Sequence, residues 1–233
     1  MELLLFSNST NAGEEYFTYP IPHIKEFLNG KKAENIIFIP YAAVTFSYDI
    51  YEEKVNTRLE TIGYKVKGIH RFENKQKAIE KADVIMVGGG NTFHLLKNCY
   101  DENILIFIRN KVVNGTPYIG WSAGSNLACP TICTTNDMPI VQPPSFEALN
   151  LIPFQINPHY LDANPEGHAG ETREQRILEF LAANPTKMVI GLREGCWIIK
   201  KEEKITLHGN KSARIFKYNQ DPFELLPESE IKI

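Results

Sequence analysis

The sequence has few cysteines, no excess of basic residues and no long apolar run. Its four cysteines form no CxxC pair, so neither a disulfide framework nor a zinc finger is expected. The 25 basic residues face 28 acidic ones, and the formal net charge of -3 excludes the strong positive field of a nucleic-acid-binding protein. No segment approaches the roughly 18 apolar residues of a membrane span. We therefore expect a cytoplasmic protein that binds neither nucleic acid nor a membrane.

Apolar strand-like segments alternate with helix-like segments along most of the chain. Residues 82–87 are apolar almost throughout, which is typical of a strand buried on both faces of a sheet. A long helix is expected from about 92 to 113, where a glycine follows as a stop signal. The alternation predicts an α/β fold in three layers with a mainly parallel sheet, in one domain over residues 1–233. Other expected elements are strands at 2–6, 35–39, 65–69, 117–121 and 187–192, and helices at 51–62 and 171–183.

Two parts of the chain depart from this alternation. Segments 196–200, 204–207 and 213–218 look like short strands joined by tight polar turns, and we expect an antiparallel appendage to the same domain. Residues 129–165 are rich in proline and hold few periodic apolar positions. Long irregular segments inside compact domains are usually functional or disordered, and this one carries candidate catalytic side chains. We therefore interpret it as functional.

The sharpest motif is Gly120-Trp121-Ser122-Ala123-Gly124, a G-x-S-x-G pentapeptide. An apolar strand leads into it and small residues lead out of it, which matches the strand–turn–helix of a nucleophile elbow. Such a turn lifts the Ser122 hydroxyl above the sheet edge and aims the backbone N–H of Ala123 at a reacting carbonyl. Ser122 is therefore the candidate nucleophile, and an ordinary turn with a structural serine is the alternative.

A second motif, GGGNT at residues 88–92, directly follows the expected strand at 82–87. Glycines at the end of a strand let backbone N–H groups approach a ligand closely. The run matches neither a dinucleotide fingerprint nor a phosphate loop. We expect Gly89 and Gly90 to join Ala123 as oxyanion donors and Asn91 to contact substrate. A tight turn capped by Asn91 is the alternative interpretation, and both can be true.

A serine nucleophile needs a general base, and the base needs an orienting acid. Of the six histidines, His159 ranks first because it follows a short strand at the start of a loop, where catalytic side chains of α/β folds gather. His168, in a glycine-containing loop, ranks second. Asp137 in the irregular segment and Glu194 at the end of the strand 187–192 are both candidate acids. The residues alone do not choose between them.

Together these residues resemble peptidase E, the α-aspartyl dipeptidase family of serine peptidases. The resemblance implies a flavodoxin-like or class I amidotransferase-like α/β sandwich, with Ser122 as nucleophile and His159 as base. For the third member of the triad the resemblance offers Asp137 and Glu194, and we place Asp137 slightly ahead. Glu194 stays a candidate because related cyanophycin-degrading peptidases look as if they use a glutamate there. The matching segments are GGGNTF at 88–93, IGWSAGSNLACPTI at 119–132, TTNDMPIV at 134–141, QINPHY at 155–160, GETREQRI at 170–177 and VIGL at 189–192.

The resemblance also implies a substrate, a small dipeptide with an N-terminal aspartate (Asp-X). Its β-carboxylate suits a bidentate guanidinium, and Arg173 is our candidate, with Arg176 as the nearest competitor. We expect the free α-ammonium to meet an acid such as Glu171 or a backbone carbonyl. The reaction is acyl transfer through an acyl-enzyme, which requires no cofactor and no metal. The sequence is compatible with a monomer or a homodimer.

Two alternatives lead to other functions. A cyanophycinase-like enzyme or an esterase would also use G-x-S-x-G, but the chain has no HGGG-type run of the esterases, and the candidate base lies early, close behind Ser122. A non-catalytic, amidotransferase-like binding protein could share the layered fold. In that class the elbow residue is usually cysteine, whereas Ser122 stands there in this chain.

Overall fold

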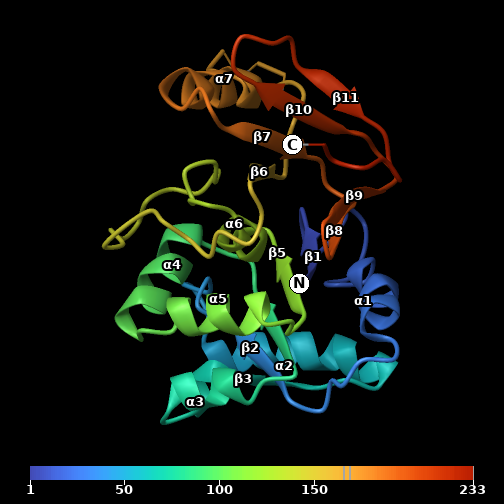
Figure 1. The fold of residues 1–233 in the computed structure, drawn as a ribbon, viewed down its shortest axis with the longest axis vertical. Helices are drawn as coiled ribbons and strands as arrows, with labels where there is room; N and C mark the ends of the chain where they lie inside the picture. The colour runs from blue at the N-terminus through green and yellow to red at the C-terminus, as the bar shows by residue number, and fades with distance from the viewer. Residues whose placement is uncertain (165, 168, 233) are drawn as a thin grey trace.

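The computed structural model describes residues 1–164, 166–167 and 169–232 (Figure 1). In this part of the chain the strands form a seven-stranded sheet, ordered β3-β2-β4-β5-β1-β8-β9, and a four-stranded sheet, ordered β11-β10-β7-β6. Figure 1 shows the smaller sheet at the upper end of the molecule. The larger sheet contains β1 (Glu2–Phe6), β2 (Ile36–Ile39), β3 (Val66–Gly68), β4 (Val84–Val87), β5 (Tyr118–Trp121), β8 (Cys196–Lys201) and β9 (Lys204–Gly209). The smaller sheet contains β6 (Gln155–Pro158), β7 (Met188–Leu192), β10 (Ala213–Lys217) and β11 (Phe223–Leu225).

Helices cover both faces of the larger sheet. Successive side chains of a strand point to opposite faces, so Leu4 of β1 packs with α1 (Pro20–Leu28) and α2 (Tyr48–Leu59). Leu3 faces the other way, into the cluster formed with α3 (Lys75–Glu80), α4 (Thr92–Asp101), α5 (Leu105–Val113) and α6 (Ala123–Ala128). Strands β1 to β5 pair in parallel, which confirms the expected α/β fold with a mainly parallel central sheet.

Two expectations about individual elements are wrong. The helix expected over residues 92–113 is divided into α4 and α5, because Asn103 between them adopts a left-handed backbone with φ 52°. The C-terminal strands are not an appendage. Strand β8 extends the central sheet by antiparallel pairing with β1. Its alternate residues Cys196 and Ile198 are fully buried, so this strand is part of the core. Strands β10 and β11 complete the smaller sheet, whose outer face is covered by α7 (Arg173–Ala183) through Ile177 and Leu181.

The topology brings strand ends together. Strands β1, β4 and β5 run in parallel, so the residues that follow Phe6, Val87 and Trp121 meet at one edge of the larger sheet. In the smaller sheet β6 pairs in parallel with β7, with Pro158 opposite Leu192. The Asn126 side chain of α6 donates to the Ile156 carbonyl of β6 at 2.8 Å, which ties the two sheets together beside these edges.

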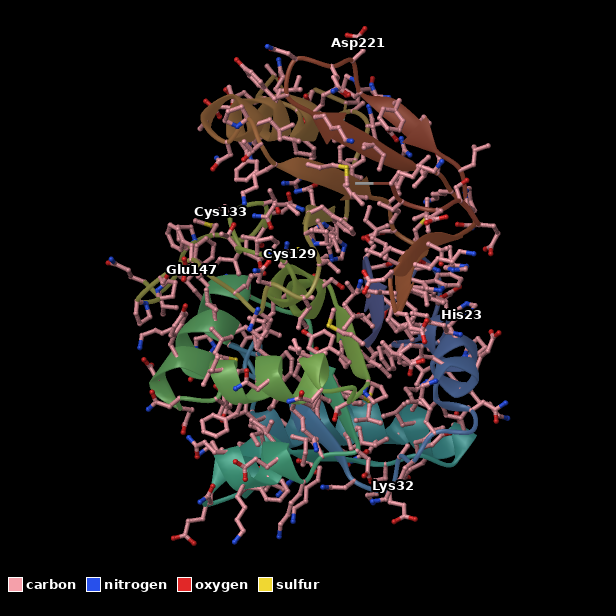
Figure 2. The ribbon with its side chains drawn as sticks, viewed as in Figure 1. His23, Lys32, Cys129, Cys133, Glu147 and Asp221 are labelled. Carbon is pink, nitrogen blue, oxygen red and sulfur yellow. The ribbon has the colours of Figure 1, made fainter. Side chains whose placement is uncertain are left out.

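The thiols and the surface add two further observations. All four cysteines are free; Cys129, the first residue of the irregular segment, is buried, and Cys133 in the same segment is exposed. Figure 2 labels both residues. Burial raises the pKa of the Cys129 thiol to about 12, so it stays protonated and is a poor nucleophile. None of the helices in the described ranges has both the length and the apolar character needed to cross a membrane.

Candidate active site

Ser122 occupies a strained turn between β5 and α6. Its backbone has φ 51° and ψ -111°, a conformation that non-glycine residues rarely adopt, and its N–H donates to the Phe6 carbonyl at 3.1 Å. The flanking glycines are needed for space. A Cβ on Gly120 would lie 2.6 Å from the Gly124 carbonyl oxygen, and one on Gly124 would lie 2.2 Å from the Val87 carbonyl oxygen. The G-x-S-x-G pattern is therefore a steric requirement of this turn.

His159 and Glu194 extend from Ser122 in a hydrogen-bonded line. The Nε2 atom of His159 lies 2.9 Å from Ser122 Oγ, and its Nδ1 atom lies 2.7 Å from Glu194 Oε1. His159 is the first residue after β6 and Glu194 follows the end of β7, so the parallel pairing of these strands sets their separation. Both side chains are about two-fifths exposed, which leaves them accessible to a ligand. This is the arrangement of nucleophile, base and orienting acid in a serine hydrolase.

Asp137, placed first among the two candidate acids, does not contact His159. Its Oδ2 atom accepts hydrogen bonds from the backbone N–H of Thr92 at 2.7 Å, the Thr92 hydroxyl at 2.5 Å and the Thr135 hydroxyl at 3.0 Å. Both ring nitrogens of His159 are engaged elsewhere, by Ser122 and Glu194. The contacts therefore favour Glu194 and correct the order of preference that placed Asp137 first.

The triple-glycine loop lies directly against the nucleophile. A Cβ on Gly89 would lie 3.1 Å from the Ser122 Cβ, and one on Gly90, where φ is 135°, would lie 2.3 Å from the Ala42 carbonyl oxygen. Asn91, expected at the substrate, instead uses its side chain within the protein. Its Oδ1 atom accepts from the His94 N–H at 3.0 Å to cap α4, and its Nδ2 atom donates to the Met138 carbonyl at 2.9 Å.

Ser122 and His159 open into a hollow with a volume of about 520 Å³, a size suited to a small ligand. Its described lining residues include one lysine, Lys54, and one carboxylate, Asp137. The Lys54 ammonium lies 5.1 Å from the centre of the Phe46 ring. The remaining lining residues are Ser9, Tyr16, Phe46, Tyr51, Gly89, Gly90 and Trp121. Sequence reasoning missed the wall from residues 9–54, because it contains no motif. Its one signal is the helical spacing that puts Tyr51 and Lys54 on the same side of α2.

The other expected substrate residues are not among the described lining residues of this hollow. Arg173 begins α7, and its Nη1 atom donates to Asn136 Oδ1 at 2.6 Å. Arg173 is half-buried, and this burial lowers the pKa of its guanidinium. Arg176 and Glu171 are exposed and lie 3.8 Å apart, Nε to Oε2. His168, the second candidate base, lies outside the described residues.

One group of acidic and histidine side chains in the described residues has the spacing of metal ligands. The ligand atoms of Asp49, Glu52 and His70 lie within 4.8 Å of one another. Arg71 already contacts both carboxylates, with Nε 2.6 Å from Glu52 Oε2 and Nη2 2.8 Å from Asp49 Oδ1. The guanidinium neutralises the site that a metal ion would need, so we interpret the group as an ion-pair cluster.

Comparisons with known proteins identify the family. A family model described as Peptidase family S51 matches residues 3–208. A relative named Peptidase E from Nostoc sp. (strain PCC 7120) is 52% identical over 229 residues, covering 98% of this chain and 94% of the relative. Another named Peptidase E, from Shigella flexneri serotype 5b, is 50% identical over 225 residues, covering 97% of each.

Two solved structures show the same fold. A putative peptidase E from Listeria monocytogenes EGD-e is 24% identical with a TM-score of 0.67, covering 90% of this chain and 98% of that one. A peptidase from an acI-B1 Actinobacterium is 18% identical with a TM-score of 0.73, covering 100% and 96%. Since the family model matches nearly the whole chain and the relatives share half of its residues, the resemblance is confirmed: the chain belongs to peptidase family S51 and is a peptidase.

Proposed function

We propose that the enzyme is a serine peptidase that hydrolyses dipeptides with an N-terminal aspartate, using Ser122, His159 and Glu194. The observation that carries this proposal is the continuous hydrogen-bonded line of 2.7 Å and 2.9 Å from Glu194 through His159 to the Ser122 hydroxyl. A carboxylate on Nδ1 favours the tautomer whose Nε2 accepts a proton, which is what a general base for serine requires.

In the proposed reaction the Ser122 hydroxyl attacks the aspartyl carbonyl while His159 takes its proton. Glu194 stabilises the imidazolium that forms, and the N–H groups of Ala123, Gly89 and Gly90 receive the oxyanion. The imidazolium then protonates the leaving amine, and the C–N bond breaks to leave an aspartyl ester on the serine. Water, deprotonated by the same histidine, hydrolyses this ester and restores the hydroxyl.

Arg173 is the proposed reader of the β-carboxylate. The guanidinium is half-buried, and in the described residues no carboxylate oxygen lies within 4.0 Å of its nitrogens. It is held beside the base, because its partner Asn136 also donates to the Pro158 carbonyl, next to His159, at 2.6 Å. The charge of Asp137 acts on this guanidinium without a direct ion pair, so its N–H groups stay available to a carboxylate ligand, which a planar guanidinium can bind through two of them.

Lys54 is the proposed reader of the second carboxylate, on the leaving residue. The hollow contains this one lysine among its described lining residues, and the Phe46 ring supports its ammonium by a cation–π contact. A dipeptide carries its C-terminal carboxylate one residue beyond the bond that is cleaved. A cation placed to meet this carboxylate would favour dipeptides. A longer substrate has a neutral peptide bond at the same position and would gain less from the cation.

The test is hydrolysis of a dipeptide panel by the purified protein: Asp-Leu, Asn-Leu, Glu-Leu, Ala-Leu and β-Asp-Leu. We expect Asp-Leu to be cleaved fastest and Ser122→Ala to abolish cleavage. Arg173→Ala should lower kcat/KM for Asp-Leu about 10- to 100-fold, the range of a charged hydrogen bond, and leave Asn-Leu unchanged. Arg176→Ala removes an exposed guanidinium of the same helix and serves as the control. Equal turnover across the panel, or full activity of Ser122→Ala, would refute the proposal.

A further inference from the structure

Asp137 is a carboxylate beside the nucleophile for which the proton relay has no use. It lines the same hollow as Ser122 and His159, and it is the one acidic residue among the described residues of that lining. Glu194 already occupies the histidine nitrogen that an orienting acid would take. A charge this close to the reacting bond affects what binds there, because electrostatic interactions are strong in a partly enclosed site.

The carboxylate of Asp137 is held at one oxygen only. Its Oδ2 atom accepts from the Thr92 N–H, the Thr92 hydroxyl and the Thr135 hydroxyl, at 2.5–3.0 Å. These donors are all neutral, and in the described part of the chain no lysine, arginine or histidine nitrogen lies within 4.0 Å of the carboxylate. Asp137 is thus a fixed anion in the hollow that is held by neutral donors, and the Arg173 guanidinium acts on it only electrostatically, from beyond 4.0 Å.

The neighbouring residue indicates which cation this anion would meet. Asn136 holds the Arg173 guanidinium at 2.6 Å, so the proposed reader of the β-carboxylate is attached to the residue next to Asp137. In an N-terminal aspartyl residue the α-ammonium and the β-carboxylate are carried by adjacent carbon atoms. Asp137 and the Arg173 guanidinium, which the adjoining Asn136 holds, therefore offer opposite charges to these two neighbouring groups. The alternative acid, Glu171, is exposed and already lies 3.8 Å from Arg176.

We propose that Asp137 binds the free α-ammonium of the substrate's N-terminal residue and so restricts the enzyme to unblocked N-termini. This inference rests on the proposed function, because it assumes that an aspartyl residue occupies the hollow. An ammonium supplies three N–H donors and a positive charge, and the carboxylate oxygen Oδ1 is available to accept one of them.

The test compares two anilides that differ by the amino group alone: aspartyl 4-nitroanilide and its des-amino analogue, succinic acid mono-4-nitroanilide. Asp137→Asn retains an oxygen that can accept from the Thr92 N–H but removes the charge. We expect the wild type to prefer the amino substrate, and Asp137→Asn to reduce that kcat/KM ratio about 10- to 100-fold, since a hydrogen bond to a charged group is worth this factor. The kcat/KM for the des-amino substrate should stay within about threefold.

Three results would overturn the inference: equal use of both anilides by the wild type, an equal loss on both in Asp137→Asn, or a collapse of the ratio in Glu171→Gln instead. Glu179→Gln, the same change at an exposed position of α7, is the control. Titration calorimetry with aspartate and with succinate repeats the comparison without turnover. If the wild type cleaves neither anilide nor Asp-Leu, the proposed function fails. The calorimetry still decides whether Asp137 reads an ammonium, and equal affinities would refute that reading.

Discussion

Ser7 contacts the backbone of His159, the proposed base, and its replacement by alanine is the most informative single perturbation of this site. It follows β1 and is fully buried. Its hydroxyl donates to the Leu192 carbonyl at 2.7 Å and accepts from the backbone N–H of His159 at 2.9 Å. The next residue, Asn8, accepts from the Gly195 N–H at 2.9 Å, beside Glu194. The two residues after β1 therefore hold the backbone at His159 and the backbone next to Glu194.

The structure sets the size of the expected effect. In Ser7→Ala the Leu192 carbonyl still accepts from the Tyr160 N–H at 3.1 Å, whereas the His159 N–H loses its acceptor. A fully buried donor left unpaired costs about 1–3 kcal/mol, which is the upper bound for this partly buried N–H. His159 is held at φ 53°, so the backbone can relieve this cost by moving the imidazole away from Ser122. We expect kcat for Asp-Leu to fall about 10- to 100-fold, with KM within about twofold.

The assay is initial-rate hydrolysis of Asp-Leu, together with urea unfolding of each variant. Ser7→Thr keeps the hydroxyl and should recover part of kcat. Ser125→Ala is the matched control, because it removes an equally buried hydroxyl that donates to the Phe6 and Gly120 carbonyls and contacts neither His159 nor Glu194. An unchanged kcat in Ser7→Ala, or an equal fall in Ser125→Ala, would show that the hydroxyl does not position the base.

Three further predictions follow from the site and its surroundings. Glu194→Gln should lower kcat by about 10³-fold, since the neutral amide no longer stabilises the imidazolium; kcat within tenfold of wild type contradicts its role. Lys54→Met should raise KM for Asp-Leu about tenfold and leave aspartyl 4-nitroanilide unaffected, because the anilide lacks the second carboxylate; equal effects would refute the assignment. Hydrogen bonds from Arg193 lower the pKa of Glu224 from 4.5 to about 2, so its stabilisation is present above pH 4.5 and is lost as the pH falls toward 2. Glu224→Gln should therefore reduce the free energy of unfolding by about 0.5–1 kcal/mol at pH 7, and this difference should close near pH 2; a difference independent of pH would contradict the linkage.

The elbow could be predicted from the sequence because its requirements are local. The apolar run before Ser122 and the two glycines around it specify a strand, a sharp turn and close contacts within a few residues. The histidine ranked first also lies against Ser122, at a strand end that its flanking residues indicate. By contrast, Glu194 reaches His159 through the parallel pairing of β6 with β7 in a second sheet. An apolar pattern predicts a strand, but it does not name the neighbour of that strand.

Two other features depend on tertiary contacts that the sequence does not express. The break between α4 and α5 occurs at Asn103, and asparagine marks a left-handed helix end less often than glycine does. The wall of the hollow around Lys54 comes from α2, far from Ser122 in the chain, and is brought near by the order of strands in the sheet. The first feature has only one asparagine as its local signal, and the second has no local motif, so residue types alone indicate them weakly.

The proposed proton relay is divided between two sheets, and this arrangement affects how the enzyme loses activity. Ser122 belongs to the larger sheet, and His159 and Glu194 belong to the smaller one. The two sheets share one hydrophobic core, so a displacement too small to open that core is enough to lengthen the 2.9 Å contact. We expect mild urea to inactivate the enzyme before it changes the tryptophan fluorescence, because both tryptophans, Trp121 and Trp197, lie in the larger sheet. Loss of turnover would then report a shift between the two sheets at lower urea concentrations than the fluorescence change does.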